Sequence, residues 1–128
     1  MLAFDYGSKK IGVAIGNTLT GQARPLKIIT STTRDQRFGA LAELLREWEP
    51  ARVVVGLPLT LDGGEQPASV RCRRFANQLR GRFGIIVELV DERGSSVEAQ
   101  ELLGSHAADD AMAAAVILQR YLDAHVPA

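Results

Sequence analysis

The sequence predicts an α/β fold in which a five-stranded mixed sheet is flanked by helices. Three apolar segments follow one another near the N-terminus, at residues 2–6, 11–16 and 26–29, and are typical of an antiparallel three-strand meander. Helical and strand patterns then alternate, which is typical of helix-linked strands. The run at residues 52–56 is continuously apolar, which indicates a strand buried on both faces. A single domain covering residues 1–128 is expected.

The elements after the meander are predicted from apolar periodicity and from residues typical of helix starts. They are a helix at residues 33–48, the strand at 52–56, a helix at 67–80, a strand at 85–90, a short helix at 96–103 and a last helix from Asp109 or Asp110 through Tyr121. The first helix carries Phe38, Leu41 and Leu45 on one apolar stripe. Pro67 suits the first position of the second helix, because its missing N–H has no helical partner there.

Asp5 is an acidic residue at the end of the first predicted strand. Alternation places Leu2, Phe4 and Tyr6 on one face of this strand, so Ala3 and Asp5 are expected on the other. A carboxylate in a core strand is costly unless a cation, a donor or a proton compensates it. The following strand carries glycines that let a backbone or a ligand come close. This arrangement favours a carboxylate aimed at a metal ion or a phosphate, the alternative being a simple turn cap.

Two further acidic sites lie at the ends of predicted elements. Asp91 and Glu92 end the fifth strand, and Asp110 begins a last helix that is apolar nearly all round and therefore buried. Carboxylates that meet repel each other, by about 4 kcal/mol at 4 Å for an effective dielectric near 20, so protons or divalent cations must offset the charge. Oxygen ligands without His or Cys favour Mg²⁺ or Mn²⁺. Asp91 and Glu92 point to opposite faces, and the pattern alone leaves open which one faces Asp5.

Charge and cysteine content exclude several classes of protein. Fifteen basic and fifteen acidic residues cancel, so the net charge implies no partner. Residues 66–87 nevertheless contain five arginines and no acid, and Arg71 and Arg74 are spaced to share a helix face, which is either a nucleic-acid surface or a solvated face. The single cysteine, Cys72, excludes a disulfide framework and a cysteine zinc site. With no signal peptide or membrane span recognised, a soluble cytoplasmic protein is expected.

Several motifs in a fixed order resemble the YqgF family, also called RuvX or pre-16S rRNA nuclease, whose members have an RNase H-like fold. The motifs are FDYGSKKIGVAIG at residues 4–16, VVVGLPLTLDGGEQ at 53–66, RRFANQL at 73–79, VDERGSSVEA at 90–99 and DDAMAAAVILQRYL at 109–122. The resemblance covers nearly the whole chain. It implies a nuclease that uses Mg²⁺ or Mn²⁺ and acts on nucleic acid.

The resemblance also implies roles for individual acidic residues. Asp5, Glu92 and Asp110 match the catalytic acids, with Glu92 favoured over Asp91 as the fifth-strand ligand. All four, Asp91 included, are candidate metal ligands. A shared divalent ion would hold Asp5, Asp110 and either Glu92 or Asp91 together at one site.

The basic candidates for nucleic-acid binding come partly from the resemblance. Lys9 and Arg74 match basic positions that face nucleic acid, and Arg71 and Arg93 are further candidates for contacts with the phosphate backbone. The expected partners are the ribosomal RNA precursor or branched DNA, with the ribosomal subunit as a further partner, and a monomer or weak homodimer is expected.

Three functions remain open at this point. The first is a nuclease that matures the 5′ end of the 16S ribosomal RNA precursor, and the second is a Holliday junction resolvase acting on branched DNA. The third is a non-catalytic RNA- or ribosome-associated module, which the zero net charge and the short segment at residues 104–108 favour. A fragment of a phosphate-handling ATPase is a weaker reading, because such folds need many more residues.

Overall fold

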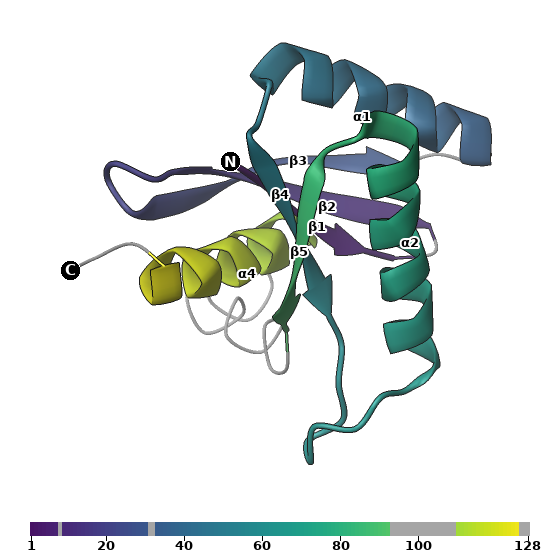
Figure 1. Cartoon of the computed structure of the whole chain (residues 1–128), viewed down its shortest axis with the longest axis vertical. Helices are drawn as coiled ribbons and strands as arrows, with labels where there is room; N and C mark the ends of the chain where they lie inside the picture. The colour runs from purple at the N-terminus through teal and green to yellow at the C-terminus, as the bar shows by residue number, and fades with distance from the viewer. Residues whose placement is uncertain (8, 31–32, 93–109, 126–128) are drawn as a thin grey trace.

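The computed structural model describes residues 1–7, 9–30, 33–92 and 110–125. These residues form a five-stranded sheet in the order β3-β2-β1-β4-β5, with α1 and α2 on one face and α4 on the other (Figure 1). In chain order the elements are β1 (Leu2–Tyr6), β2 (Lys10–Asn17), β3 (Gln22–Thr30), α1 (Arg34–Trp48), β4 (Arg52–Leu57), α2 (Pro67–Phe83), β5 (Ile86–Asp91) and α4 (Asp110–His125). The predicted mixed sheet flanked by helices is confirmed.

The meander is formed by antiparallel pairing of β1 with β2 and of β2 with β3. β3 is longer than the predicted strand at residues 26–29 and contains Pro25. The pairing register shifts between Val13 and Ala14, which pair with Lys27 and Pro25, so that Leu26 has no partner. A proline is tolerated here because β3 is an edge strand of the described sheet and the bulge absorbs the missing N–H.

Alternation along β1 separates the two cores as the sequence predicts. Leu2 and Phe4 are fully buried in the core shared with α1 and α2, and Tyr6 packs against that core. Ala3 is buried in the second core, beneath α4. Asp5, two residues further along, therefore points towards the face that α4 covers.

The parallel half of the sheet consists of β1, β4 and β5, with β4 in the middle. Val53 and Val55 contribute to the α1–α2 core, whereas Val54 contributes to the α4 core. The apolar run predicted to be buried on both faces is thus confirmed. Because the three strands run in parallel, their carboxyl ends meet at one edge of the sheet.

The helix boundaries agree with the predicted ones to within a few residues. Thr33 caps α1 by accepting a hydrogen bond from the Gln36 N–H at 3.1 Å. α2 continues three residues beyond the predicted end at residue 80, and it stops at Gly84, whose φ of 64° is left-handed. The predicted helix at residues 96–103 and Asp109, one of the two predicted starts of the last helix, lie outside the described residues. No helix in the described part of the chain is long and apolar enough to cross a membrane.

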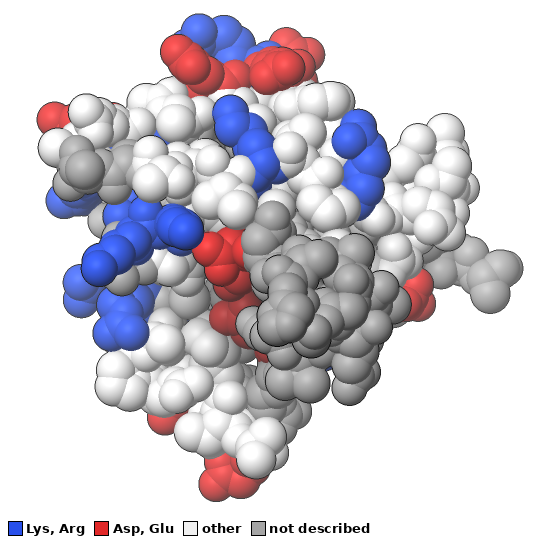
Figure 2. All heavy atoms as spheres, turned by 180° about the vertical axis from the view of Figure 1, so that it is seen from behind, with Lys and Arg blue, Asp and Glu red and all other residues white. Residues whose placement is uncertain are grey.

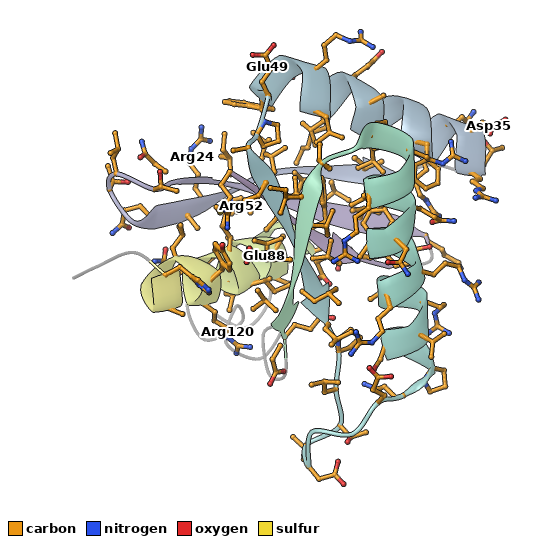
Figure 3. The ribbon with its side chains drawn as sticks, in the orientation of Figure 1. Arg24, Asp35, Glu49, Arg52, Glu88 and Arg120 are labelled. Atoms are coloured by element: carbon orange, nitrogen blue, oxygen red, sulfur yellow. The ribbon has the colours of Figure 1, made fainter. Side chains whose placement is uncertain are left out.

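Polar contacts fix the C-terminal half of α4 to the sheet. Arg52 forms an ion pair with Glu88 at 2.9 Å on the neighbouring strand and donates to the Tyr121 hydroxyl at 3.1 Å (Figure 3). The Gln119 side chain binds the backbone of the β2–β3 hairpin, accepting from the Ala23 N–H at 3.0 Å. With these contacts in place, the start of α4 is held at the opposite end, near the carboxyl end of β1.

Candidate active site

The end of β1 and the end of β5 bring two acidic side chains together. Asp5 is the second-last residue of β1. Glu92 directly follows β5, and the Glu92 N–H donates to the Leu57 carbonyl at 3.1 Å. This bond continues the strand pairing by one residue and directs Glu92 towards β4. Gly56 leaves room for it, because a Cβ atom there would lie 2.7 Å from Glu92 Oε2. The Asp5 and Glu92 side chains are hydrogen-bonded to each other.

The hydrogen bond between Asp5 and Glu92 requires a proton, because two ionised carboxylates offer only acceptors. Burial raises the pKa of Asp5, the hydrogen bond with Glu92 partly opposes this, and the charge of Asp110 raises it further. Burial together with the charge of Asp5 raises the pKa of Glu92 to about 8. Without a cation, the pair therefore retains a proton at neutral pH.

Asp110 adds a third acidic residue on the face of the sheet towards which Asp5 points. It starts α4 and lines a hollow of about 340 Å³ together with Asp5, Lys9 and Lys10; we call this the acidic hollow. Asp110 acts on Asp5 through its charge. Among the residues that the structure describes, however, no three His, Cys, Asp or Glu side chains are grouped tightly enough to form a ready metal site. The structure thus brings two acids into contact and a third into electrostatic range.

A glycine in β2 allows Asp110 to come this close. Gly12 pairs with Asp5 across the β1–β2 ladder. A Cβ atom on Gly12 would lie 1.9 Å from the Asp110 carbonyl oxygen, far inside any permitted contact. The predicted close approach of backbone to this strand is therefore confirmed, and the approaching backbone is the first turn of α4.

Asp91 and Arg120 lie beside Glu92. Asp91 pairs with Leu57 in the β4–β5 ladder, and its carbonyl accepts from Arg120 Nη1 at 3.1 Å. Figure 3 shows Arg120 on α4, near the end of β5. The positive charge of Arg120 lowers the pKa of Glu92, whereas the charge of Asp91 raises it. Of the two neighbouring acids, Glu92 is the one that contacts Asp5. The sequence analysis did not identify Arg120, because the spacing between Arg120 and the other site residues follows no pattern that indicates a shared site.

The buried side of α2 also borders the acid pair. Cys72 is buried, and this burial, followed by the charges of Glu92 and Asp5, raises its pKa to about 12. Its thiol therefore stays protonated and is no nucleophile. Arg71 and Arg74 lie on the exposed side of α2 and line a common hollow, as their spacing predicts. Arg93, the last basic candidate, lies outside the described residues.

Basic and acidic side chains gather side by side on the face of the molecule seen from behind. Figure 2 shows acidic side chains in the middle of this face and a group of Lys and Arg side chains next to them. Lys9 and Lys10 line the acidic hollow itself. The acidic hollow is therefore lined by two exposed lysines and two half-buried carboxylates.

Comparison with known families agrees with this geometry. A profile of RuvX, described as Holliday junction resolvase, matches residues 1–124. The chain belongs to the RuvX family. The resemblance to the YqgF/RuvX family noted from the motifs is thereby confirmed.

Curated relatives of this RuvX chain match over almost all of its length. A protein of Bordetella parapertussis named "Putative pre-16S rRNA nuclease" is 77% identical over 123 residues, which are 96% of this chain and 92% of the relative. A protein of Cupriavidus necator with the same name is 52% identical over 124 residues, covering 96% of this chain and 87% of the relative.

Solved structures confirm the RNase H-like fold of this RuvX chain. Thermus thermophilus RuvC in complex with a Holliday junction substrate matches with a TM-score of 0.57 and 17% identity, covering 97% of this chain and 94% of that chain. The Fowlpox virus resolvase, solved with Holliday junction DNA, matches with a TM-score of 0.59 and 13% identity, covering 99% of this chain and 100% of that chain.

The acid pair predicts an unusual pH dependence of stability for this RuvX chain. Glu92 has a pKa of about 8 in the folded state against an ordinary 4.5, so the folded protein binds more protons between these values. Without metal, its free energy of unfolding should therefore fall as pH rises from about 4.5 to about 8. Glu92→Gln cannot ionise, and it should be more stable than the wild type at pH 9 by about 2 kcal/mol, a value discounted for partial solvent screening. Urea denaturation in EDTA at several pH values measures this.

Glu47→Gln is the matched control, because Glu47 is exposed on α1. This variant should retain the pH slope of the wild type. A Glu92→Gln variant with the same slope as the wild type would show that Glu92 holds no proton in the folded protein.

Proposed function

We propose that this chain is a divalent-metal-dependent endonuclease that hydrolyses phosphodiester bonds in the 5′-end maturation of the 16S ribosomal RNA precursor. The observation that carries the proposal is the buried Asp5–Glu92 pair, with Asp110 beside it, at the carboxyl edge of the sheet. The family and the names of the curated relatives support the substrate. The proposal implies a cytoplasmic protein that meets the precursor, free or on the ribosomal subunit.

The three acids Asp5, Glu92 and Asp110 fit Mg²⁺ or Mn²⁺. They offer carboxylate oxygens, which are the ligands that these hard cations prefer. When no cation is present, the carboxylates of Asp5 and Glu92 share a proton. A divalent cation that replaces this proton would attract both carboxylates strongly. Asp5 and Glu92 would hold the ion, with Asp110 as the third ligand, and Asp91 would add negative charge beside Glu92. The ion supplies Lewis-acid stabilisation of the negative charge that develops on the phosphate oxygens.

The chain's own groups bind and orient the substrate. Lys9, an exposed residue that lines the acidic hollow, would pair with a phosphate next to the scissile one, and Arg71 and Arg74 would hold the backbone further along. Arg120 would keep Glu92 in its ionised form when the ion is bound, because its charge lowers the pKa of that carboxyl.

The test is cleavage of a 5′-extended 16S precursor RNA by the purified protein in Mg²⁺ or in Mn²⁺. We expect cuts near the mature 5′ end, none in EDTA, and recovery when the metal is restored. A four-way DNA junction and a linear duplex serve as comparison substrates. Cleavage that persists in EDTA, or an absence of cleavage with either metal, would contradict the proposal.

A resolvase activity is the second candidate function. The description of the matching family profile and the resolvase structures with the same fold favour it. Resolution requires paired cuts in two strands and hence two active sites. Faster cleavage of the junction than of the RNA, together with a dimer in analytical ultracentrifugation, would favour this function over rRNA maturation.

A further inference from the structure

We infer that four arginines of α1 and α2 form a groove that binds the phosphate backbone of the nucleic-acid strand leading into the acidic hollow. They are Arg34 and Arg37 of α1 and Arg71 and Arg74 of α2. The inference rests on the proposed function, because it names the path of that substrate. It assigns Arg34 and Arg37, which the sequence pattern did not single out.

The four arginines surround one hollow of about 310 Å³; we call it the arginine groove. Tyr6 and Phe38 also line it, and none of the described residues around it is acidic. Tyr6 lines the acidic hollow as well, and Asp5 precedes it in β1. The arginine groove and the acidic hollow are therefore adjacent, so one strand can occupy both.

Aromatic rings hold the α1 arginines in place. Arg37 Nη1 donates to the Tyr6 hydroxyl at 2.9 Å, and its guanidinium carbon lies 5.4 Å from the centre of the Tyr6 ring. The guanidinium of Arg34 lies 5.8 Å from the ring centre of Phe38, which is buried. A guanidinium that rests on a ring loses less freedom on binding and can still use its N–H edges for phosphate oxygens.

Three of the four arginines in the groove have no carboxylate paired with them among the described residues. Within the described residues, Arg34, Arg71 and Arg74 form no ion pair, whereas Arg52 and Arg73 are paired with Glu88 and Glu65. Clustered arginines in a chain of zero net charge create a local positive potential. A polyanion that follows the groove is the partner that such a potential attracts.

The aromatic floor excludes base stacking as the mode of binding. One face of Tyr6 is stacked on Phe75, with ring centres 4.4 Å apart, and Arg37 lies over its ring. Phe38 is covered by Arg34 and by Arg82, whose guanidinium lies 4.1 Å from its ring centre. The groove therefore contacts the phosphate backbone and not the bases. We expect substitution of its arginines to lower the affinity for RNA and for DNA strands by similar factors.

The test compares the binding of labelled single strands of RNA and DNA, of equal sequence, by fluorescence anisotropy in EDTA across a salt series. The double variant Arg34→Ala/Arg37→Ala should bind at least about tenfold more weakly at low salt. Its plot of log affinity against log salt should be shallower by about 1.4, since each lost contact with a single strand removes about 0.7. Arg71→Ala/Arg74→Ala, altered only at exposed positions of α2, should show the same change.

Arg24→Ala/Arg46→Ala is the matched control, because it removes the same charge from exposed arginines outside the groove. It should retain the salt slope of the wild type. Equal slopes for all three double variants, or no measurable binding by the wild type, would overturn the inference. Groove-dependent binding without any metal-dependent cleavage would instead leave the groove in place and refute the nuclease proposal.

Discussion

Asp5→Asn should lower the rate of metal-dependent cleavage by about 10³-fold, the scale on which loss of one charge-stabilising group acts in an active site. Asn has the size of Asp but lacks the negative charge that attracts a cation. The fold should tolerate the change, because burial already raises the pKa of Asp5 and so disfavours its charged form. Single-turnover cleavage at saturating metal measures the rate. Thermal melts with and without Mn²⁺ should show a metal-dependent rise in Tm for the wild type and little for the variant.

Asp123→Asn provides the matched control for this prediction. Asp123 is exposed near the end of α4 and accepts a hydrogen bond from Gln119 at 2.9 Å, which an Asn oxygen can also accept. The cleavage rate and the metal-dependent shift in Tm of the Asp123→Asn variant should equal those of the wild type. If Asp5→Asn kept more than a tenth of the wild-type rate, Asp5 could not be a ligand of the catalytic ion.

The sequence was sufficient to predict the two-sided sheet and the acids at its edge. Alternation in β1 assigns Phe4 to one core and Asp5 to the opposite face, and this depends only on local geometry. The meeting of Asp5 with the end of β5 also follows from pattern, because parallel strands end at a common edge. Such features are encoded in short segments and need no knowledge of long-range packing.

Other features depend on contacts between distant segments. The choice between Asp91 and Glu92 is decided by one hydrogen bond, from the Glu92 N–H to the Leu57 carbonyl, which extends the strand pairing beyond β5. The joining of Arg34 with Arg74 in one groove depends on how α1 and α2 pack on the sheet. Neither the register at a strand end nor the relative placement of two helices can be read from periodicity.

Gly12→Ala should destabilise the protein by about 3 kcal/mol, at the upper end of the usual cost of overpacking. The added methyl would collide with the Asp110 carbonyl, and the backbone of α4 cannot rotate away as a flexible side chain could. Relief requires the first turn of α4 to move outwards, which also moves Asp110 away from Asp5. Urea denaturation gives the change in stability, and cleavage at a temperature where the variant is folded should fall as well.

Gly39→Ala is the control with the opposite expected sign. Gly39 lies within α1, and a Cβ atom there meets nothing within 4 Å. Replacing an exposed helical glycine by alanine should therefore stabilise the protein by up to about 1 kcal/mol. Both variants add one methyl group, so a loss of stability at Gly12 beside a gain at Gly39 would indicate the contact of α4 with β2 as the cause. Equal stability of the two variants would show that Gly12 does not set the approach of Asp110 to Asp5.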